Sequence, residues 1–239
     1  MNKIYNKVVL ITGSNTGIGK ETAFQFAKEG CKLVITYYKD KNDALEVSKK
    51  CLELGATDVL LVKLDISNSK SVQSTVKKVI SKFKSISILI NNAGVLVWKP
   101  FNKNSHKDIE FQIRTNLEGT IKMTRECLPY VKDTVITVAS MAGKIPFAEL
   151  STYCATKFGL RGFTQSLAKE IPNLKFYSVN PGATATKMTN FQGVPAEKVA
   201  EVILRTAKER SLPSGADVDV WEILDQGIPN LKPGDRSIQ

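Results

Sequence analysis

Short apolar runs alternate with amphipathic stretches along most of this chain. Helical periodicity marks GKETAFQFAKEG, DALEVSKKCLELG and SKSVQSTVKKVISKF, which separate the first runs. Six of the runs have the composition of buried strands: Val8–Ile11, Leu33–Thr36, Val59–Val62, Ile86–Ile90, Val135–Val138 and Lys175–Val179. A further strand is expected within Ala216–Trp221, before a polar tail, PNLKPGDRSIQ. Because alternating strands and helices pack as right-handed β-α-β units, the pattern predicts an α/β fold, a doubly wound parallel sheet of about seven strands with helices on both faces.

Composition fits one globular domain spanning residues 1–239. Hydrophobic residues make up 42% and charged residues 24%, and the sequence contains no repeat or linker. The four cysteines have no paired spacing and no histidine partners, so we expect reduced thiols and no metal site. We expect a cytoplasmic protein, because the first strand follows the amino terminus almost directly and no apolar run is long enough to cross a membrane.

The formal net charge of +11 leaves several partners open. Nucleic acid, an anionic surface and a polyanionic cofactor would each be attracted by it. However, the lysines are scattered among acidic residues in stretches such as KNDALEVSKK, and there is no basic tail. This distribution favours a solvated surface, so we expect neither a nucleic-acid nor a membrane partner.

A glycine-rich turn joins the first predicted strand to the first predicted helix. Glycine lets the backbone turn sharply and approach a ligand, and the helix amino terminus offers free N–H groups to a pyrophosphate. In an alternating β/α chain this position predicts a dinucleotide-binding site. The candidate cofactor-binding residues are Gly13, Ser14, Asn15, Thr16, Gly17, Ile18 and Gly19.

The residues after the second strand bear on the choice of cofactor. A site that selects NAD is expected to place an acidic residue here for the adenosine ribose. The chain has Tyr37 in that place, followed by Tyr38 and Lys39, and the lysine could meet a 2′-phosphate. We therefore favour NADP(H) as cofactor. NAD(H) stays possible because Asp40 is close by.

Ser140, Tyr153 and Lys157 form a candidate catalytic group. Tyr153 and Lys157 are four residues apart, so on a helix both side chains can point at one target. A nearby ammonium favours the phenolate, so we expect Lys157 to lower the pKa of Tyr153 and make it a general acid/base. Ser140 follows the apolar run VITVA, at a strand end where open α/β sheets bind ligands.

Taken together, these motifs resemble the short-chain dehydrogenase/reductase family, whose members are single-domain Rossmann-type oxidoreductases. The turn fits the family's Thr-Gly-x-x-x-Gly-Ile-Gly, and the serine precedes Tyr-x-x-x-Lys at a fitting distance. Asn-Asn-Ala-Gly at 91–94, Asn-x-x-Gly at 116–119 and Pro-Gly-x-x-x-Thr at 181–186 also fit. The resemblance runs from about Lys7 to Thr186.

The resemblance implies roles for further residues. Asn116 would complete a catalytic tetrad with Ser140, Tyr153 and Lys157 by holding a water that links the lysine to solvent. Tyr153 and Lys157 would also contact the cofactor. The other residues implied in cofactor binding are Asp65 and Ile66 at the adenine, Asn92, Ala93 and Gly94 at the adenosine ribose, and Pro181, Gly182, Ala183, Thr184 and Thr186 at the carboxamide.

The function implied is an NAD(P)(H)-dependent oxidoreductase. It would transfer a hydride between the nicotinamide and a small-molecule carbonyl or alcohol, as a carbonyl reductase does, with Tyr153 as general acid/base and no metal. Two alternatives remain: a reductase of 3-oxoacyl groups on an acyl carrier protein, and a catalytically silent dinucleotide-sensing regulator. The second is disfavoured because all four tetrad residues are present.

The segments that contact substrate are expected around residues 187–196, a short substrate loop, and within Val95–Phe101 and Met141–Leu150. Their aromatic and methionine side chains would form either an apolar pocket or ordinary packing. We expect a homodimer or homotetramer. Many relatives end in a strand followed by paired glycines, which Ala216–Glu222 lacks, so the choice between the two stays open.

Overall fold

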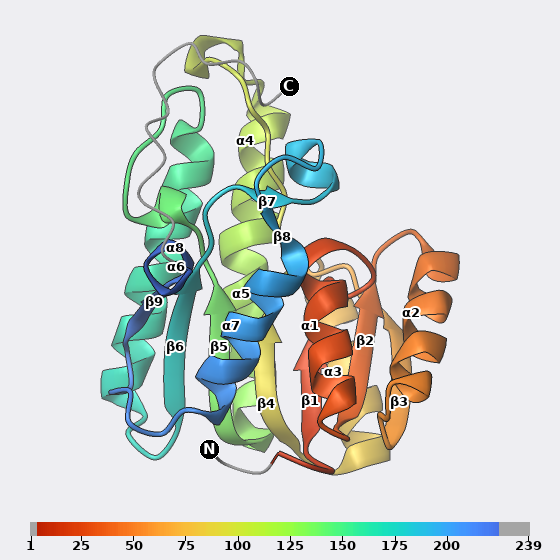
Figure 1. Cartoon of the computed structure of the whole chain (residues 1–239). Helices are drawn as coiled ribbons and strands as arrows, with labels where there is room; N and C mark the ends of the chain where they lie inside the picture. Colours follow the sequence, from red (N-terminus) through yellow and green to blue (C-terminus); the bar gives the residue numbers. More distant parts are fainter. Residues whose placement is uncertain (1–3, 225–239) are drawn as a thin grey trace.

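A computed structural model describes residues 4–224 and shows a seven-stranded, wholly parallel sheet in the order β3-β2-β1-β4-β5-β6-β9 (Figure 1). The strands are β1 (Val8–Ile11), β2 (Lys32–Tyr37), β3 (Asp58–Lys63), β4 (Ile86–Asn91), β5 (Val131–Val138), β6 (Lys175–Asn180) and β9 (Asp217–Asp219). The doubly wound parallel sheet predicted from the sequence is confirmed. After β3 the chain crosses back over the sheet and adds β4 on the other side of β1. The strand order therefore reverses between β1 and β4, and this switch point opens a crevice at the carboxyl ends of these strands.

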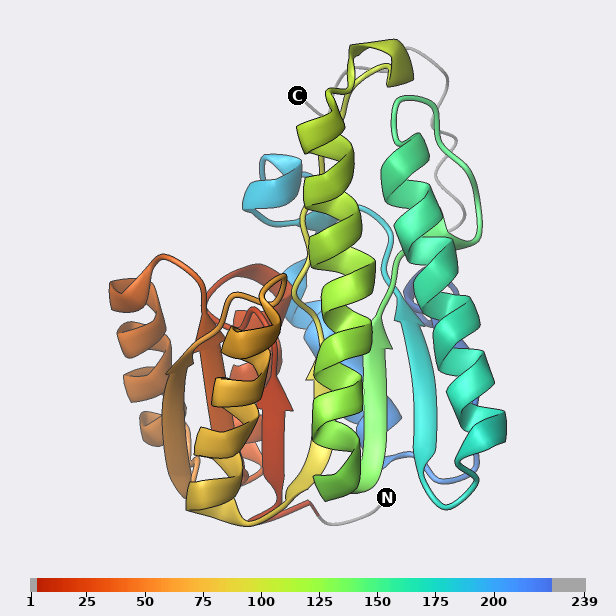
Figure 2. The same ribbon diagram turned by 180° about the vertical axis from the view of Figure 1, so that it is seen from behind.

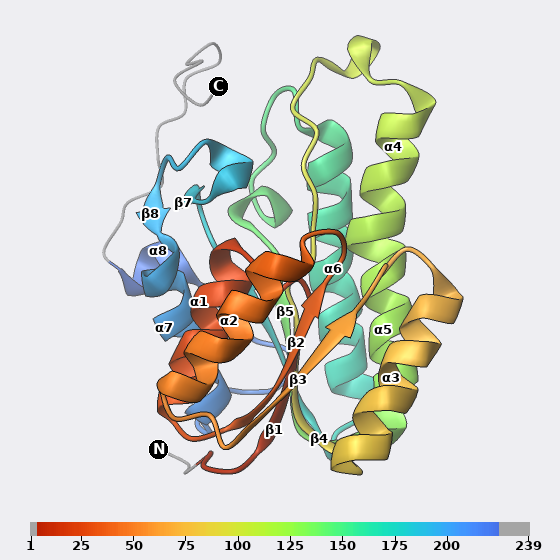
Figure 3. The ribbon, with the colours of Figure 1, turned by 90° about the vertical axis from the view of Figure 1, so that its right-hand side faces the viewer.

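Helices cover both faces of the sheet. The helices are α1 (Gly17–Lys28), α2 (Lys41–Glu53), α3 (Ser69–Phe83), α4 (His106–Gln112), α5 (Gly119–Cys127), α6 (Ser151–Glu170), α7 (Ala196–Lys208) and α8 (Val220–Ile223). In the view along the sheet, α1, α2 and α7 lie on one side, and α3, α5 and α6 lie on the other (Figure 3). The view from behind shows α5 and α6 side by side (Figure 2).

Two apolar cores hold the layers together, one on each face. Ile11 and Ile35 point into the core under α1 and α7, whereas Leu10 and Val34 point into the core under α3 and α5. All four residues of β1 are buried, as expected for a strand covered by helices on both sides. This explains why the central strands have continuous apolar sequences rather than alternating ones.

Two strand boundaries differ from expectation. β5 begins at Val131 rather than Val135, because the more polar residues at its start still pair with β4. The strand expected within Ala216–Trp221 is present as β9, which ends at Asp219, where the chain turns into α8. Val220 and Trp221 are buried, which explains their strand-like composition. The polar tail PNLKPGDRSIQ lies outside the described residues.

Within residues 4–224, the helices are all too short or too polar to span a membrane. The same part of the chain contains no group of three or more His, Cys, Asp or Glu residues placed to hold a metal ion. The four cysteines are buried free thiols.

Candidate active site

The glycine-rich turn is packed backbone against backbone. Gly13 has a positive φ of 64°, and its N–H donates to Thr36 Oγ1 over 2.9 Å. A Cβ on Gly13 would lie 3.0 Å from Ala93 Cα, and one on Gly19 would lie 2.3 Å from the Gly13 carbonyl oxygen. Any larger residue at Gly19 would therefore force the turn apart. α1 begins within this turn at Gly17, so its positive dipole end faces the crevice.

Two predicted cofactor-binding residues hold this turn in shape. Asn92 Nδ2 donates to the carbonyl oxygens of Thr12 and Gly13, over 2.9 and 3.0 Å. The Ser14 hydroxyl donates to Ile11 O and accepts from Thr36 N, each over 2.9 Å, and Ser14 is fully buried. The Ser14 side chain therefore supports the turn from behind, whereas Asn92 also lines the cavity beside it.

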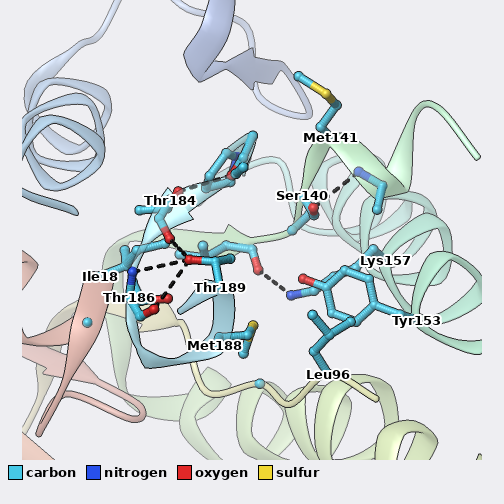
Figure 4. A pocket seen from close by; sticks show the side chains of 18 of the residues that line it. Ile18, Leu96, Ser140, Met141, Tyr153, Lys157, Thr184, Thr186, Met188 and Thr189 are labelled. Atoms are coloured by element: carbon cyan, nitrogen blue, oxygen red, sulfur yellow. Dashed lines mark hydrogen bonds between the residues drawn. The ribbon is translucent and has the colours of Figure 1, made fainter. Parts of the chain in front are cut away.

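A cavity of about 260 Å³ opens at the carboxyl edge of the sheet, next to the turn (Figure 4). It brings together residues that lie far apart in the sequence. Of the predicted site residues, it is lined by Thr16, Gly17, Ile18, Asn92, Gly94, Ser140, Tyr153, Lys157, Pro181, Gly182, Ala183, Thr184 and Thr186.

The remaining predicted site residues do not line this cavity. Tyr37 is the last residue of β2 and Tyr38 and Lys39 follow it, and Asp65 and Ile66 follow the carboxyl end of β3. Since the strands are parallel, these ends lie on the same edge of the sheet as the cavity. Asp65 Oδ1 accepts from the backbone N–H and the hydroxyl of Ser67, so part of its carboxylate shapes the turn before α3.

Tyr153 and Lys157 lie one turn apart on α6 and both face the cavity, opposite the end of β5 that carries Ser140 (Figure 4). Lys157 Nζ lies 5.5 Å from the centre of the Tyr153 ring and donates to Val138 O over 3.0 Å. Ser140 Oγ accepts from Ala142 N over 3.1 Å. The backbone fixes this arrangement, because a Cβ on Gly143 would come within 2.8 Å of the Lys157 carbonyl oxygen.

The expected lowering of the Tyr153 pKa is not found. Burial raises the pKa of Tyr153 to about 12, and the hydrogen bond with Ser140 works only partly against it. Burial also lowers the pKa of Lys157 to about 8, because the charged form loses its hydration. Lys157 Nζ lies 5.5 Å from the centre of the ring, and its charge does not offset the effect of burial on the phenol. In this state Tyr153 is a firmly protonated proton donor.

Asn116 lies in a π-helical segment, Ile113–Glu118, between α4 and α5. Its side chain is fully buried and pairs with both backbone groups of Val95, accepting from N over 2.7 Å and donating to O over 2.8 Å. Nδ2 also donates to Thr156 Oγ1, which in turn donates to the Tyr153 carbonyl oxygen. Asn116 therefore fixes the loop after β4 to α6, behind the cavity wall rather than in it.

Leu96, Met188 and Thr189 line the cavity from the segments expected to contact substrate, whereas Val138 and Ala139 line it without having been predicted. Thr189 Oγ1 contacts the carbonyl oxygens of Thr184, Thr186 and Gln192, and thereby shapes the substrate loop. The spacing of Thr186 and Thr189 is that of a reciprocal cap, which the structure contains and the sequence could have revealed. Val138 and Ala139 carry no such signal, because nothing in the sequence marks an apolar residue at a strand end as a pocket wall.

The expected substrate loop is closed by a short parallel pair, β7 (Thr184–Ala185) with β8 (Val194–Pro195). The apolar pocket expected from the aromatic and methionine residues is only partly made of them. Trp98, Met141 and Phe147 line the cavity, whereas Phe101 and Phe191 are 64% and 68% exposed and lie outside it.

Comparison with known proteins identifies the family. Residues 7–194 match the model of the short chain dehydrogenase family. The chain is 32% identical to "NADP-dependent 3-hydroxy acid dehydrogenase" of Schizosaccharomyces pombe, over 85% of this chain and 88% of the relative. It is 31% identical to an "uncharacterized oxidoreductase" of Staphylococcus saprophyticus, over 80% and 79%.

Solved structures agree with this relationship. A short chain dehydrogenase from Burkholderia cenocepacia, in complex with NADP, superposes with a TM-score of 0.85 at 25% identity, over 91% of this chain and 97% of that one. Four-fifths or more of the chain thus matches a solved short chain dehydrogenase and a relative named as an NADP-dependent dehydrogenase. The protein belongs to the short-chain dehydrogenase/reductase family and is a nicotinamide-dependent oxidoreductase acting on CH–OH and C=O groups.

Proposed function

We propose that the enzyme is a carbonyl reductase that uses NADPH, with Ser140, Tyr153 and Lys157 at the reacting carbonyl. The observation that carries the proposal is the meeting of these three side chains in one cavity beside the glycine-rich turn. The cavity fits a dinucleotide: Gly17 of the turn and Gly94 after β4 line it without side chains, and α1 begins beside it at Gly17.

In this proposal the reduced nicotinamide supplies the hydride, and the protein supplies orientation and the proton. Ser140 Oγ already accepts from Ala142 N, so its own proton can be donated to the substrate oxygen. Tyr153, protonated because its pKa is about 12, delivers a proton to the same oxygen as negative charge develops there. Lys157 and Asn116 hold the tyrosine's surroundings, the lysine through Val138 O and the asparagine through Thr156.

The preference for NADPH rests on the end of β2. Tyr37 stands where an acidic residue would select NADH, and the exposed Lys39 lies with Nζ 5.5 Å from the centre of the Tyr38 ring. A 2′-phosphate bound there would pair with the Lys39 ammonium. The Lys39 side chain would lose little conformational freedom, because it already rests on the Tyr38 ring. One relative is named as NADP-dependent, and a related structure contains NADP, which supports the same preference.

Steady-state kinetics test the cofactor preference. The ratio of kcat/KM for NADPH to that for NADH should exceed one in the wild type and fall in Lys39→Ala. Lys132 is exposed and lies at the amino end of β5, at the opposite end of the strands from the cofactor site. Lys132→Ala should therefore leave the ratio unchanged. A wild-type preference for NADH would refute the proposal.

The reaction itself is tested by NADPH consumption against ketones, aldehydes and 3-oxoacyl thioesters, with Tyr153→Phe as control. Turnover should fall by a factor of about 10³ or more in this variant, while NADPH binding measured by fluorescence stays intact. Undiminished turnover would exclude Tyr153 as proton donor. Tight NADPH binding without any turnover would instead favour the dinucleotide-sensing role.

Assembly, domain organisation and location complete the proposal. Phe111 on α4, Ile121 on α5 and Phe158 on α6 are exposed, and a homodimer would bury such side chains. Light scattering of the purified protein should give twice the monomer mass.

We also propose a single domain over residues 1–239, in which 187–196 form the substrate loop, and a cytoplasmic location. A single unfolding transition and cell fractionation test these two points.

A further inference from the structure

Trp98 forms part of the wall of the cavity. It lies in the loop after β4, and the residue is 39% exposed, which places it at the rim. The indole Nε1 donates to Glu149 Oε2 over 3.0 Å, and the next backbone N–H, that of Lys99, donates to Glu149 O over 3.2 Å. Glu149 thus joins the two loops that flank the cavity.

Glu149 holds an unusual backbone conformation to do this. Its φ is 64°, in the left-handed region where a glutamate is uncommon and strained. Such strain persists only where surrounding contacts fix the residue, and it occurs preferentially at ligand sites. The two hydrogen bonds to the Trp98–Lys99 segment are contacts of this kind.

The Trp98 loop is also held from the side of α4. Val97 N donates to Gln112 Oε1 over 3.2 Å, and Lys99 Nζ donates to Asp108 Oδ2 over 2.9 Å. Together with the Asn116–Val95 pair, these bonds fix the loop at four successive points. The indole is therefore placed before any substrate arrives, and its N–H is already used, so it offers a substrate only an apolar face.

The charges around the cavity disfavour an anion. Of the described lining residues, Lys157 and Lys187 are the only cations. Lys157 is buried in the catalytic group, and Lys187 lies with 73% of its side chain exposed and Nζ 3.8 Å from Asp43. The Glu149 carboxylate stands at the rim beside Trp98.

The cations below the cavity are engaged as well. Arg161 is paired with Asp217, and Lys144 is paired with Asp219. The remaining walls include Leu96, Phe147, Leu150 and Met188, which are apolar. A carboxylate bound between them would lose its hydration without gaining a partner.

We infer that the substrate is an uncharged, apolar carbonyl compound whose length is limited by Trp98, with Glu149 as the residue that positions Trp98. The inference rests on the proposed carbonyl reductase function and adds the substrate class and its size limit. Carbonyl compounds that carry a carboxylate near the reacting carbon are disfavoured, because the lining cation outside the catalytic group, Lys187, lies beside Asp43 and because Glu149 is negatively charged.

The charge selection is tested with a matched pair, a 3-oxo acid and its methyl ester. The acid is the sharpest competitor because a relative of this chain is named for 3-hydroxy acids. The wild type should have a kcat/KM for the ester at least about tenfold above that for the acid. Glu149→Gln keeps an acceptor oxygen for Trp98 but removes the charge, so it should reduce the difference in kcat/KM between the ester and the acid. An acid that is used as well as the ester by the wild type overturns the inference.

The size limit is tested with a series of methyl ketones of increasing chain length. Trp98→Ala should raise kcat/KM for long ketones relative to short ones by about tenfold, the usual worth of a hydrophobic contact. Glu149→Ala should shift the profile in the same direction without touching the wall itself. Phe101→Ala, an exposed aromatic three residues away, should leave it unchanged. An unaltered profile in both Trp98→Ala and Glu149→Ala overturns the role of Trp98.

The two levels of the proposal fail differently. If the wild type reduces no ketone, ester or acid, the carbonyl reductase function fails and this inference fails with it. If ketones are reduced but the acid matches the ester, only the substrate class is wrong. NADPH binding and the unfolding temperature of each variant show whether a loss comes from misfolding.

Discussion

The cofactor side of the active-site cavity is built from main chain, whereas the substrate side is built from side chains. On the cofactor side, main chain packs on main chain: a Cβ on Gly19 would meet the Gly13 carbonyl oxygen at 2.3 Å. On the substrate side, the wall consists of side chains such as Trp98 and Met188, carried by loops from separate parts of the chain. The first side tolerates no added atom, whereas the second can change shape with a single substitution. A common cofactor and variable substrates require this division.

The largest expected effect tests the main-chain side. Gly19→Ala should destabilise the protein by about 3 kcal/mol or more, because the new methyl group collides with backbone that cannot move aside. NADPH affinity should fall with it. Thermal unfolding and cofactor fluorescence measure both. Gly162→Ala is the control: its Cβ would meet no atom within 4 Å on α6, so it should stabilise by about 0.5–1 kcal/mol. If Gly19→Ala and Gly162→Ala changed the stability equally, the rigidity of the main-chain side would be contradicted.

A smaller effect is expected beneath the substrate side. Arg161 pairs with Asp217 on β9 and donates to the Gly143 carbonyl oxygen over 2.6 Å, which ties the Ser140 turn to the sheet. Arg161→Met should cost about 2–3 kcal/mol, since the Asp217 charge stays partly buried without its main partner.

Adding Asp217→Asn to Arg161→Met should recover part of this stability, as measured by denaturant unfolding. A double variant that is less stable than Arg161→Met would show that the bond to Gly143, rather than the charge pair, carries the effect. Either way kcat is expected to fall, because Ser140 sits on the same turn.

A third prediction concerns a region far from both sides, the amino edge of the sheet. Burial raises the pKa of Asp133, but hydrogen bonds from Arg210 and Lys7 outweigh it and hold the pKa at about 2. The folded state thus prefers the charged form, so its contribution is full above pH ~4 and is lost as pH falls towards 2, about 2 kcal/mol in all. Asp133→Asn should remove this part of the acid dependence without changing the kcat at neutral pH. An unchanged acid profile in Asp133→Asn would contradict the assignment.

The smallest effect is expected where the two sides meet, at Lys157. Its pKa of about 8 means that the ammonium is lost as pH rises above 8. The kcat/KM for NADPH, which reports on the free enzyme, should therefore fall by about tenfold per pH unit above that value. Tyr153, with a pKa of about 12, stays protonated over this range. A level profile up to about pH 10 would show that the cation is not needed, and Lys157→Met should abolish the slope.

The sequence predicted the fold and the cofactor side well. Val8–Ile11 and the helix Ser69–Phe83 were predicted with their observed bounds, because apolar periodicity is a local property. The glycine-rich turn was equally clear, since only glycine permits its close contacts. The strand expected within Ala216–Trp221 was found as Asp217–Asp219, but its end could not be placed, because burial alone does not distinguish a strand from a short buried helix.

The site was predicted less evenly. Ser140, Tyr153 and Lys157 were placed correctly at one cavity, but the direction of the Tyr153 pKa was wrong, because burial outweighs the effect of a lysine that lies over the ring. For Asn116 the structure adds a pairing with the backbone of Val95 that the sequence did not indicate. Both outcomes depend on distances and burial that residue spacing does not contain.

The sequence alone thus determined the alternation of strands and helices and the glycine-rich turn between the first strand and the first helix, because each is visible as a pattern of residues close together in the chain. Only the tertiary structure decided the substrate wall. Trp98 and Glu149 are 51 positions apart and are joined by one hydrogen bond across two loops. No local propensity records such a pair, because it exists only once α4, α6 and the sheet bring the two loops together.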